Sequence, residues 1–516
     1  MEPSAKQTAI ASGKQRSNID DLPDHIVHKI LNFLTIKDIA RFSTLSQRCR
    51  KLCITIPNIN IVLTDNQIWF PERARVVDFI DRFMICRNGL KLESFHLSWL
   101  FSTRSITASL HNEEYRIYSW LYQVARCNVE RLNLWIYFQE SSNVGTFVLP
   151  LCFTECTSFK YLKLGLSNGI LKLPTVGFKF LQHVLLSEAH VEQQLFEVWL
   201  SNCKCLQKLK IYNIKGIESL NINNNACLQY LEIMDYYTGT LSSINVSASR
   251  LCFLSLYWLS YQSKRKLVFS APNLETLVLE GDTDFDCHLR SLTSSLQKVS
   301  IYSQTNPAHF LSKNYQVSSS TTIRCYNQIL QSVCHAKMLL LNSAFVKLPL
   351  LEVLPRTSIQ SVHSLYLHVT PYLKLHDVNR IAFLLILFPN LKSLTLKSYF
   401  ESAAPSANLL NSSMEGSSTA IEFLLSNCPK VYLVEIDLDR EHNVLVLVKY
   451  LLMHAKELNK MKIYYSPEEH RLPSKIIRSI EAFRKASSTA AVYILPRVVP
   501  LAAKHVCFCS NSFLNF

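Results

Sequence analysis

One five-residue string in this chain has the spacing of a catalytic nucleophile. Residues 165–169 read GLSNG, which fits the G-x-S-x-G pattern of serines that attack acyl groups. That chemistry needs the serine on a strained turn that runs directly from a strand into a helix. The following residues, ILKLPTVGF, form a poor helix because Pro174 lacks a backbone donor. We therefore expect Ser167 to lie in a loop, and we assign no catalytic residue.

Metal and cofactor chemistry is not indicated either. Finger-type zinc sites use paired C-x-x-C units, and no such pair occurs among the 16 cysteines. The closest spacings are those of Cys203/Cys205, Cys507/Cys509, Cys49/Cys53 and Cys152/Cys156. The chain also lacks a P-loop, a dinucleotide fingerprint and an H-E-x-x-H string. We predict no metal, no cofactor and no enzymatic activity, with the cysteines mostly reduced and buried.

The charge balance favours acidic partners. Lysine and arginine number 54 against 39 acidic residues, a formal net charge of +15 that attracts nucleic acid or acidic proteins at long range. The charge is spread along the chain, and its densest short cluster is KRK at 264–266, which we expect in a solvated turn. A basic solenoid that binds nucleic acid is therefore kept as an alternative rather than as the favoured interpretation.

The elements that would position binding residues come from a repeated unit of the form apolar-x-x-apolar-x-apolar. It begins at Leu92, Val129 and Phe159, and then recurs at steps of 25, 22, 23, 23 and 22 residues from Leu181 to Leu296. Less regular copies begin at Ala336, Val362, Leu391, Val431 and Leu458. The alternation within each unit predicts a half-buried strand. One strand per roughly 20 to 29 residues predicts strands stacked in parallel as a solenoid.

This series resembles a leucine-rich-repeat array over roughly residues 90 to 465, although the asparagine usual after the strand is mostly absent. Stacked strands form a curved sheet whose outward side chains line a concave face. Aromatic rings supply contact area there and lysines steer acidic partners, so we predict a protein substrate on this face. The candidate substrate-binding residues are Tyr161, Lys163, Lys208, Lys210, Tyr212, Tyr230, Phe253, Tyr257 and Tyr302, with Lys298 beside them.

The stretch before the repeats has the signals of three short helices. Pro23 can open the first helix, and the acidic residues around it suit the positive end of the helix dipole. Thr35 and Asp38 have the spacing of a capping box at the start of a second helix, and Ser46 can cap a third. Helices this short bury little surface by themselves, which favours docking onto another protein.

Residues 19–60 resemble an F-box, which opens with Leu-Pro, continues with spaced aliphatic residues and closes with a basic run. The resemblance implies binding of a Skp-type adaptor, and through it a cullin, by Leu22, Pro23, Ile26, Ile30, Leu34, Leu45 and Cys49. Cysteines at 49 and 53 replace the tryptophans common at this end of the motif. Because tryptophan buries about twice the area of cysteine, we expect weaker adaptor binding.

The far end resembles the FBD region that follows F-box and leucine-rich repeats in a large plant family. The strings LFPNLKSLTLKSYFE, IEFLLSNCPKVYLVEIDL, LNKMKIYY and IEAFRKASSTAAVYI carry this resemblance. We expect apolar helical faces at 421–425 and 480–486, and an exposed loop at 401–420. The predicted division is a disordered tail (1–18), an F-box (19–60), linker helices (61–89), repeats (90–380), an FBD-like region continuing the solenoid (381–500) and a tail (501–516).

These observations predict an α/β fold, with a small three-helix F-box followed by a curved solenoid of parallel strands. The resemblance implies the substrate-recognition subunit of a Skp–cullin–F-box (SCF) ubiquitin ligase. Because the first residues, MEPSAKQTAIASGKQRSN, lack the continuous apolar centre of a secretory signal, we expect the nucleus, the cytoplasm or both. The alternatives are a leucine-rich-repeat scaffold outside any ligase and the basic nucleic-acid-binding solenoid. No membrane span is expected, because the longest apolar run, residues 381–388, is shorter than the about 20 residues that a membrane helix needs.

Overall fold

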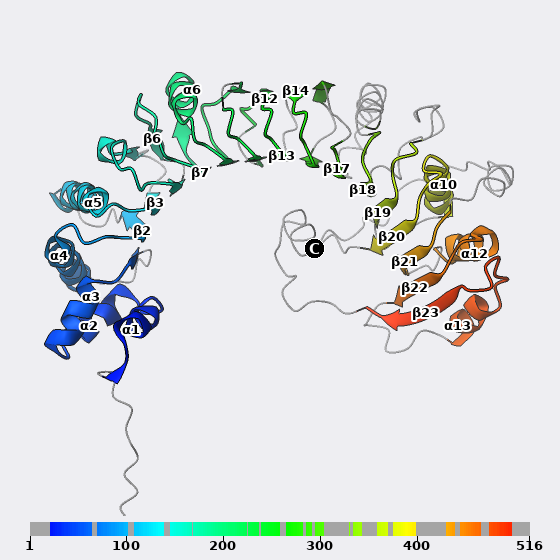
Figure 1. Cartoon of the computed structure of the whole chain (residues 1–516), viewed down its shortest axis with the longest axis horizontal. Helices are drawn as coiled ribbons and strands as arrows, with labels where there is room; N and C mark the ends of the chain where they lie inside the picture. Colours follow the sequence, from blue (N-terminus) through cyan, green and yellow to red (C-terminus); the bar gives the residue numbers. More distant parts are fainter. Residues whose placement is uncertain are drawn as a thin grey trace, which may run out of the picture. The chain divides into compact units, whose positions relative to one another are not determined.

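The structure is a computed structural model that divides into two compact units, Met1–Leu181 and Gln182–Phe516. Figure 1 shows the elements of both units along the chain. The described residues are 21–63, 70–101, 108–138, 145–167, 169–223, 225–236, 239–258, 265–281, 285–290, 295–303, 330, 334–342, 359–369, 375–398, 430–438, 444–465 and 474–497. The predicted tails (1–18 and 501–516), the helical face at 421–425 and the loop at 401–420 lie outside these ranges.

The first unit opens with three short helices, α1 (Asp24–Leu31), α2 (Ile36–Ser43) and α3 (Gln47–Ile54). The predicted caps are confirmed: the Thr35 side chain accepts from the Asp38 N–H, and the Ser46 side chain accepts from the Cys49 N–H at 3.0 Å. Each cap satisfies a backbone donor that the first helical turn leaves without a partner. Side chains from all three helices, Val27, Ile39 and Leu52 among them, meet in a small core.

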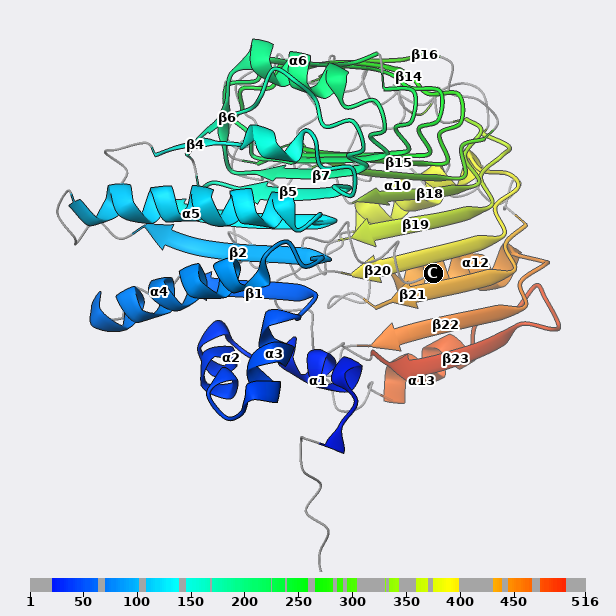
Figure 2. The same ribbon diagram turned by 60° about the vertical axis from the view of Figure 1, so that its left-hand side comes forward.

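Four parallel strands follow in this unit, in the order β1 (Asn58–Leu63), β2 (Ser94–Phe101), β3 (Arg131–Phe138) and β5 (Tyr161–Gly165). Helices α4 (Phe70–Arg87) and α5 (Ala108–Arg126) lie beside one another along one face of the strands (Figure 2). Smaller elements are β4 (Thr146–Val148), η2 (Leu151–Phe153) and β6 (Ile170–Lys172).

The strand array begins earlier than predicted. We expected linker helices over 61–89 and the first repeat at residue 90, but β1 already pairs with β2. Its sequence explains this, because Ile56, Ile59 and Ile61 have the spacing of the repeated unit with isoleucine in place of leucine. All three side chains are at most 3% exposed. Within 61–89 the structure describes one helix, α4.

The second unit carries a parallel sheet whose strands follow chain order and curve along the unit (Figure 1). Its first strands are β7 (His183–Ser187), β9 (Lys208–Tyr212), β11 (Tyr230–Asp235), β13 (Phe253–Trp258), β15 (Thr276–Gly281) and β17 (Lys298–Ser303). The sheet continues with β18 (Met338–Asn342), β19 (Ser364–Val369), β20 (Ser393–Ser398), β21 (Leu433–Asp437), β22 (Lys460–Tyr465) and β23 (Ala491–Pro496). Every predicted repeat copy forms a strand, and the parallel-strand solenoid is confirmed.

Register explains why the repeated unit works. Leu231, Leu254 and Leu277 are cross-strand neighbours, and each is fully buried. The apolar position two residues later forms a second buried row through Ile233, Leu256 and Leu279. Both rows face the interior, since side chains two residues apart share one face of a strand. The residues between and around these rows therefore point to the opposite face of the sheet.

The middle of the second unit departs from the prediction of one strand per repeat. A second parallel sheet is formed by β10 (Ser219–Ile222), β12 (Ser243–Ser247), β14 (Arg265–Ser270) and β16 (Phe285–Arg290). Pairs such as Leu220/Ile222 and Leu267/Phe269 are buried, while Asn221 and Val268 between them are exposed and half-buried. The prediction followed only the longer leucine unit and missed this shorter alternation.

Several repeat strands of the second unit are preceded by a helix, namely α6 (Gln193–Asn202), α10 (Leu375–Ile386), α12 (Leu445–His454) or α13 (Ser474–Glu481). The two-residue strand β8 (His190–Val191) lies before α6. The long apolar run at 381–388 overlaps α10, where Ile381 and Leu384 are fully buried. Among the described residues, no helix combines the length and apolar character needed to cross a membrane.

Candidate protein-binding surfaces

The helical bundle leaves large apolar side chains in solvent. Phe33 is 90% exposed, Leu45 is 70% exposed and Ile30 is 39% exposed. We call these three residues the bundle patch. Elsewhere in the bundle, α2 and α3 contact α4, and α2 also contacts β1. The bundle therefore uses part of its apolar surface within its own unit and exposes another part, which is typical of a protein-binding module.

The predicted adaptor-binding residues do not all share this exposure. Ile30 and Leu45 belong to the bundle patch, and Pro23 is exposed as well. Leu22, Ile26 and Leu34 are intermediate. Cys49 is 3% exposed and Cys53 is 1% exposed, so both thiols lie inside the bundle rather than on its outer surface. Burial, reinforced by Cys49 nearby, raises the pKa of Cys53 to about 11.

Phe33 is the residue of the bundle patch that the sequence reasoning missed. It lies just beyond the end of α1, and the prediction chose Ile26, Ile30 and Leu34 at steps of four and passed over it. The signal that could have found it is the residue type itself, because a phenylalanine in the short turn between α1 and α2 has little interior to enter. Local sequence therefore indicated a binding module but not its most exposed side chain.

Polar contacts hold the ends of the bundle together. The Arg48 guanidinium donates to the Leu22 carbonyl at 2.6 Å and to the Asp24 carboxylate at 2.9 Å, so the basic run is tied back to the Leu-Pro opening. The His28 ring nitrogen lies 3.2 Å from the Leu52 carbonyl oxygen, which joins α1 to α3. These bonds set the relative orientation of the short helices, which intrinsic helix propensity could not do.

The sheet face opposite the core carries the predicted substrate-binding residues. In the first unit, Lys163 is exposed and Tyr161 is half-buried, with the Arg131 guanidinium 5.9 Å from the Tyr161 ring centroid. His96 lies in the same face, and its pKa is lowered by burial and by the nearby Lys163 charge. This face therefore offers cations beside aromatic rings.

In the second unit, Lys208, Tyr230 and Phe253 are cross-strand neighbours on β9, β11 and β13. The rings of Tyr230 and Phe253 are stacked with centroids 4.2 Å apart and planes within 3°. The Lys208 ammonium lies 4.0 Å from the Tyr230 centroid. A cation over a tyrosine ring and parallel stacked rings are both stabilising arrangements. We call these three residues the Lys208 stack.

A carboxylate next to the Lys208 stack holds its tyrosine in place. Glu232 accepts hydrogen bonds from the hydroxyls of Tyr212 at 2.7 Å and Tyr230 at 2.5 Å, and it pairs with the Lys210 ammonium at 2.7 Å. Burial by itself would raise the pKa of Glu232, but the three donors outweigh it and lower that pKa. Burial and the Glu232 charge together raise the pKa values of Tyr212 and Tyr230. The structure therefore brings three predicted binding residues, Lys210, Tyr212 and Tyr230, into one network around Glu232.

Two predicted binding residues are not on free surface. Tyr257 is 3% exposed and Tyr302 is 8% exposed. They belong to an apolar cluster that also includes Val278 and Leu340, with Met234, Tyr236, Phe253 and Tyr366 packed against it. Tyr302 shares a 2.7 Å hydrogen bond with His368, whose pKa is lowered to about 3 by burial and by Lys397. We call the eight apolar residues of this cluster the sheet cluster: Met234, Tyr236, Phe253, Tyr257, Val278, Tyr302, Leu340 and Tyr366.

The candidate catalytic serine lies where the sequence predicted it. Ser167 occupies the turn between β5 and β6, with a φ of +44°, and a strand rather than a helix follows it. Ser167 thus lies in a turn that leaves a repeat strand. Within the described residues, no group of three or more histidine, cysteine or acidic side chains gathers as metal ligands would.

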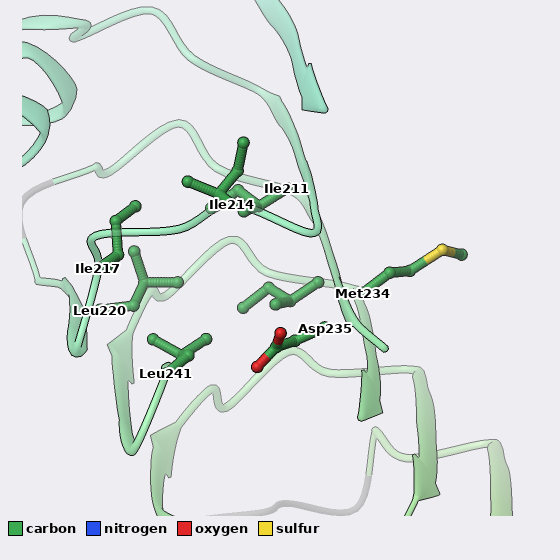
Figure 3. Close-up of a pocket in the computed structure, with 8 residues that line it drawn as sticks. Ile211, Ile214, Ile217, Leu220, Met234, Asp235 and Leu241 are labelled. Carbon is green, nitrogen blue, oxygen red and sulfur yellow. The ribbon is translucent and has the colours of Figure 1, made fainter. Parts of the chain in front are cut away.

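The interior of the second unit contains a small cavity between its two sheets (Figure 3). It encloses about 10 Å³ and is lined by Ile211, Ile214, Ile217, Leu220, Ile233, Met234, Asp235 and Leu241. That volume holds at most one water molecule, whereas sites for small organic ligands are of the order of hundreds of Å³. This cavity is therefore a packing feature and not a ligand site.

Models of two known domain families match the helical bundle and part of the stacked strands. The F-box domain model matches residues 19–59, and the model of the LRR repeats of the FBD-associated F-box protein At5g56370 matches residues 117–283. The chain therefore carries an F-box domain and repeats of the FBD-associated F-box type.

Curated relatives extend the similarity along the chain. The putative FBD-associated F-box protein At5g53635 of Arabidopsis thaliana is 25% identical over 460 residues, which cover 86% of this chain and 94% of the relative. The putative F-box/FBD/LRR-repeat protein At5g44950 of the same plant is 23% identical over 464 residues, covering 87% and 92%. The predicted resemblance to plant F-box proteins of the FBD type is confirmed.

Proposed function

We propose that this chain is a non-catalytic substrate-recognition subunit of an SCF-type ubiquitin ligase. Its F-box binds a Skp-type adaptor, the adaptor brings a cullin, and the repeat sheet holds the protein to be modified. Holding a substrate near the ubiquitin-carrying enzyme raises the effective concentration of its lysines, so the receptor needs no catalytic group of its own. The proposed location is the nucleus, the cytoplasm or both.

The bundle patch is the observation that carries this proposal. Phe33 and Leu45 are 90% and 70% exposed in the turns that follow α1 and α2, while α2 and α3 contact α4 and α2 contacts β1. Large apolar side chains exposed to this degree on a small capped bundle favour a partner surface. The F-box match covers the same residues.

The test measures binding of the full chain to a purified Skp-type adaptor. We expect Phe33→Asp and Leu45→Asp each to weaken binding by at least about tenfold, because each places a charge in an apolar contact. Ile85→Asp is the matched control, since Ile85 is 68% exposed on α4 outside the F-box. Wild-type protein that fails to bind the adaptor, or Phe33→Asp protein that binds as wild type does, would refute the proposal.

A second candidate function is that of a repeat scaffold outside any ligase. The cysteines at 49 and 53 motivate it, because the F-box pattern commonly has tryptophan at this end. Since Cys49 is buried, Cys49→Trp would overpack the bundle and cannot serve as a simple gain-of-binding variant. Retained binding of a repeat partner by a chain that never binds the adaptor would favour the scaffold.

A further inference from the structure

The sheet face of the second unit is electropositive where a partner would touch it. Between β7 and β17, the side chains on the outward face include two carboxylates, those of Glu232 and Glu280, which are 4% and 8% exposed. The lysines of the same face, Lys208, Lys210 and Lys298, are only half-buried. In the Lys210–Glu232 pair the two side chains are 24% and 5% exposed. An approaching partner therefore meets ammonium groups before it meets carboxylates.

The Lys208 stack argues against nucleic acid as that partner. Proteins that bind single strands stack bases on open aromatic faces. The ring of Tyr230 has Phe253 against one side at 4.2 Å, and the Lys208 ammonium lies 4.0 Å from its centroid. Its hydroxyl is also held by Glu232. A base has no room to stack on Tyr230, although an acidic side chain can still reach the lysine ammonium.

Apolar surface lies directly beside these cations. Phe253 belongs both to the Lys208 stack and to the sheet cluster, so the two are continuous on β13. Met234, Tyr236 and Tyr366 are partly exposed members of the sheet cluster. The network around Glu232 fixes Tyr212 and Tyr230 before any partner arrives, which lowers the entropy lost on binding.

We propose that this face binds an extended, carboxylate-rich segment of a protein, with an apolar anchor on the sheet cluster and acidic side chains at Lys208. This assignment rests on the proposed function and names the class of substrate for the same sheet. Lys208 on β9 and the half-buried Phe253 on β13 are two strand steps apart, or about 10 Å at about 4.8 Å per step, which about three residues of extended chain span. The anchor and the acidic residues are therefore separated by about three positions.

The experiment uses the full-length chain and fluorescein-labelled synthetic peptides that contain one tryptophan and a Glu-Glu pair. The separation between tryptophan and the pair runs from one to eight residues. A matched set carries Lys-Lys, a third set carries phosphoserine, and a uridine oligonucleotide provides the nucleic-acid arm. We expect the Glu-Glu peptides to bind at least tenfold more tightly than the Lys-Lys peptides, best near a separation of three, with affinity falling as salt rises. Equal binding of the Lys-Lys set, binding confined to phosphoserine peptides, or tighter binding of the oligonucleotide would overturn the inference.

Variants locate the site. Lys208→Glu should weaken binding of the best Glu-Glu peptide at least tenfold, and Lys208→Gln should have a smaller effect of the same sign. Lys204→Glu is the matched control, because Lys204 is exposed in the turn before β9 and lies outside the strand. An equal loss in Lys204→Glu and Lys208→Glu would contradict a local site, and unchanged thermal unfolding shows that both variants fold. Adaptor binding is measured on the same samples. Loss of peptide binding with intact adaptor binding would reject this inference alone. Peptide binding without adaptor binding would reject the ligase role alone.

Discussion

The Arg87 guanidinium donates to the Ile54 carbonyl oxygen at 2.6 Å and thereby joins the end of α4 to the last residue of α3. The same group donates to the carbonyls of Ile56, Leu90 and Lys91 at 2.8 to 3.3 Å. Arg87 is fully buried, and burial lowers its pKa. One side chain therefore links the F-box helices to the segments that lead into β1 and β2.

We expect Arg87→Met to lower the free energy of unfolding of the first unit by about 3 kcal/mol or more, because several buried carbonyls lose a charged donor. Thermal or urea unfolding of the full chain measures this loss. Arg126→Met is the control, since Arg126 is exposed at the end of α5. Similar losses in the two variants would show that Arg87 has no special structural role.

The cap of α3 makes a second prediction. Ser46→Ala removes the acceptor of the 3.0 Å bond from the Cys49 N–H and should cost about 1 kcal/mol of unfolding free energy. Ser46→Asp keeps an acceptor and places negative charge at the helix N-terminus, so it should stay within a few tenths of wild type. Unfolding curves for the three proteins compare them directly. A Ser46→Asp variant as unstable as Ser46→Ala would refute the capping role.

The buried pair of Arg265 and Asp235 makes a third prediction. The two groups meet at 2.7 Å with side chains 3% and 5% exposed, so the expectation of a solvated turn around 264–266 is wrong for Arg265. Arg265→Met leaves a buried carboxylate without its cation and should cost about 3 to 5 kcal/mol. Adding Asp235→Asn removes that charge and should recover part of the loss. A double variant less stable than Arg265→Met would contradict this account.

A pH dependence follows from His368. Its pKa is lowered from 6.5 to about 3, so the unfolded chain binds a proton at this site at pH values where the folded chain does not. The contribution to stability is complete above pH 6.5 and is lost as pH falls from about 6.5 towards about 3. Through His368, lowering the pH from 7.5 to 5 should reduce the free energy of unfolding by roughly 1 to 2 kcal/mol.

His368→Gln should flatten that part of the curve, because glutamine does not titrate. Urea unfolding at pH 7.5, 6 and 5 compares the slope with that of wild type. His335→Gln provides a histidine control away from the Tyr302 hydrogen bond. An unchanged slope in His368→Gln would mean that other groups carry the pH dependence.

How much the sequence predicted depends on how local each signal was. The repeated unit seen at Leu206, Leu209 and Ile211 predicts a strand wherever it recurs, because its alternation of apolar and polar residues is complete within six residues. The first strand was missed although Ile56, Ile59 and Ile61 have the same spacing. The second sheet was missed because pairs such as Leu220 and Ile222 are too short to stand out from a loop.

The sequence by itself determined the strands of the leucine repeat series and the helix caps at Thr35 and Ser46, because periodicity and capping depend on neighbours a few residues apart. Its motif strings also carried the resemblance to the F-box and the FBD region. Only the tertiary structure decided that Cys49 is buried while Phe33 is exposed. It also decided that Tyr257 and Tyr302 pack into a cluster while Lys208 lies over Tyr230. Those outcomes depend on contacts between different helices of the bundle and between different repeats across the sheet, and one-dimensional spacing carries no information on such contacts.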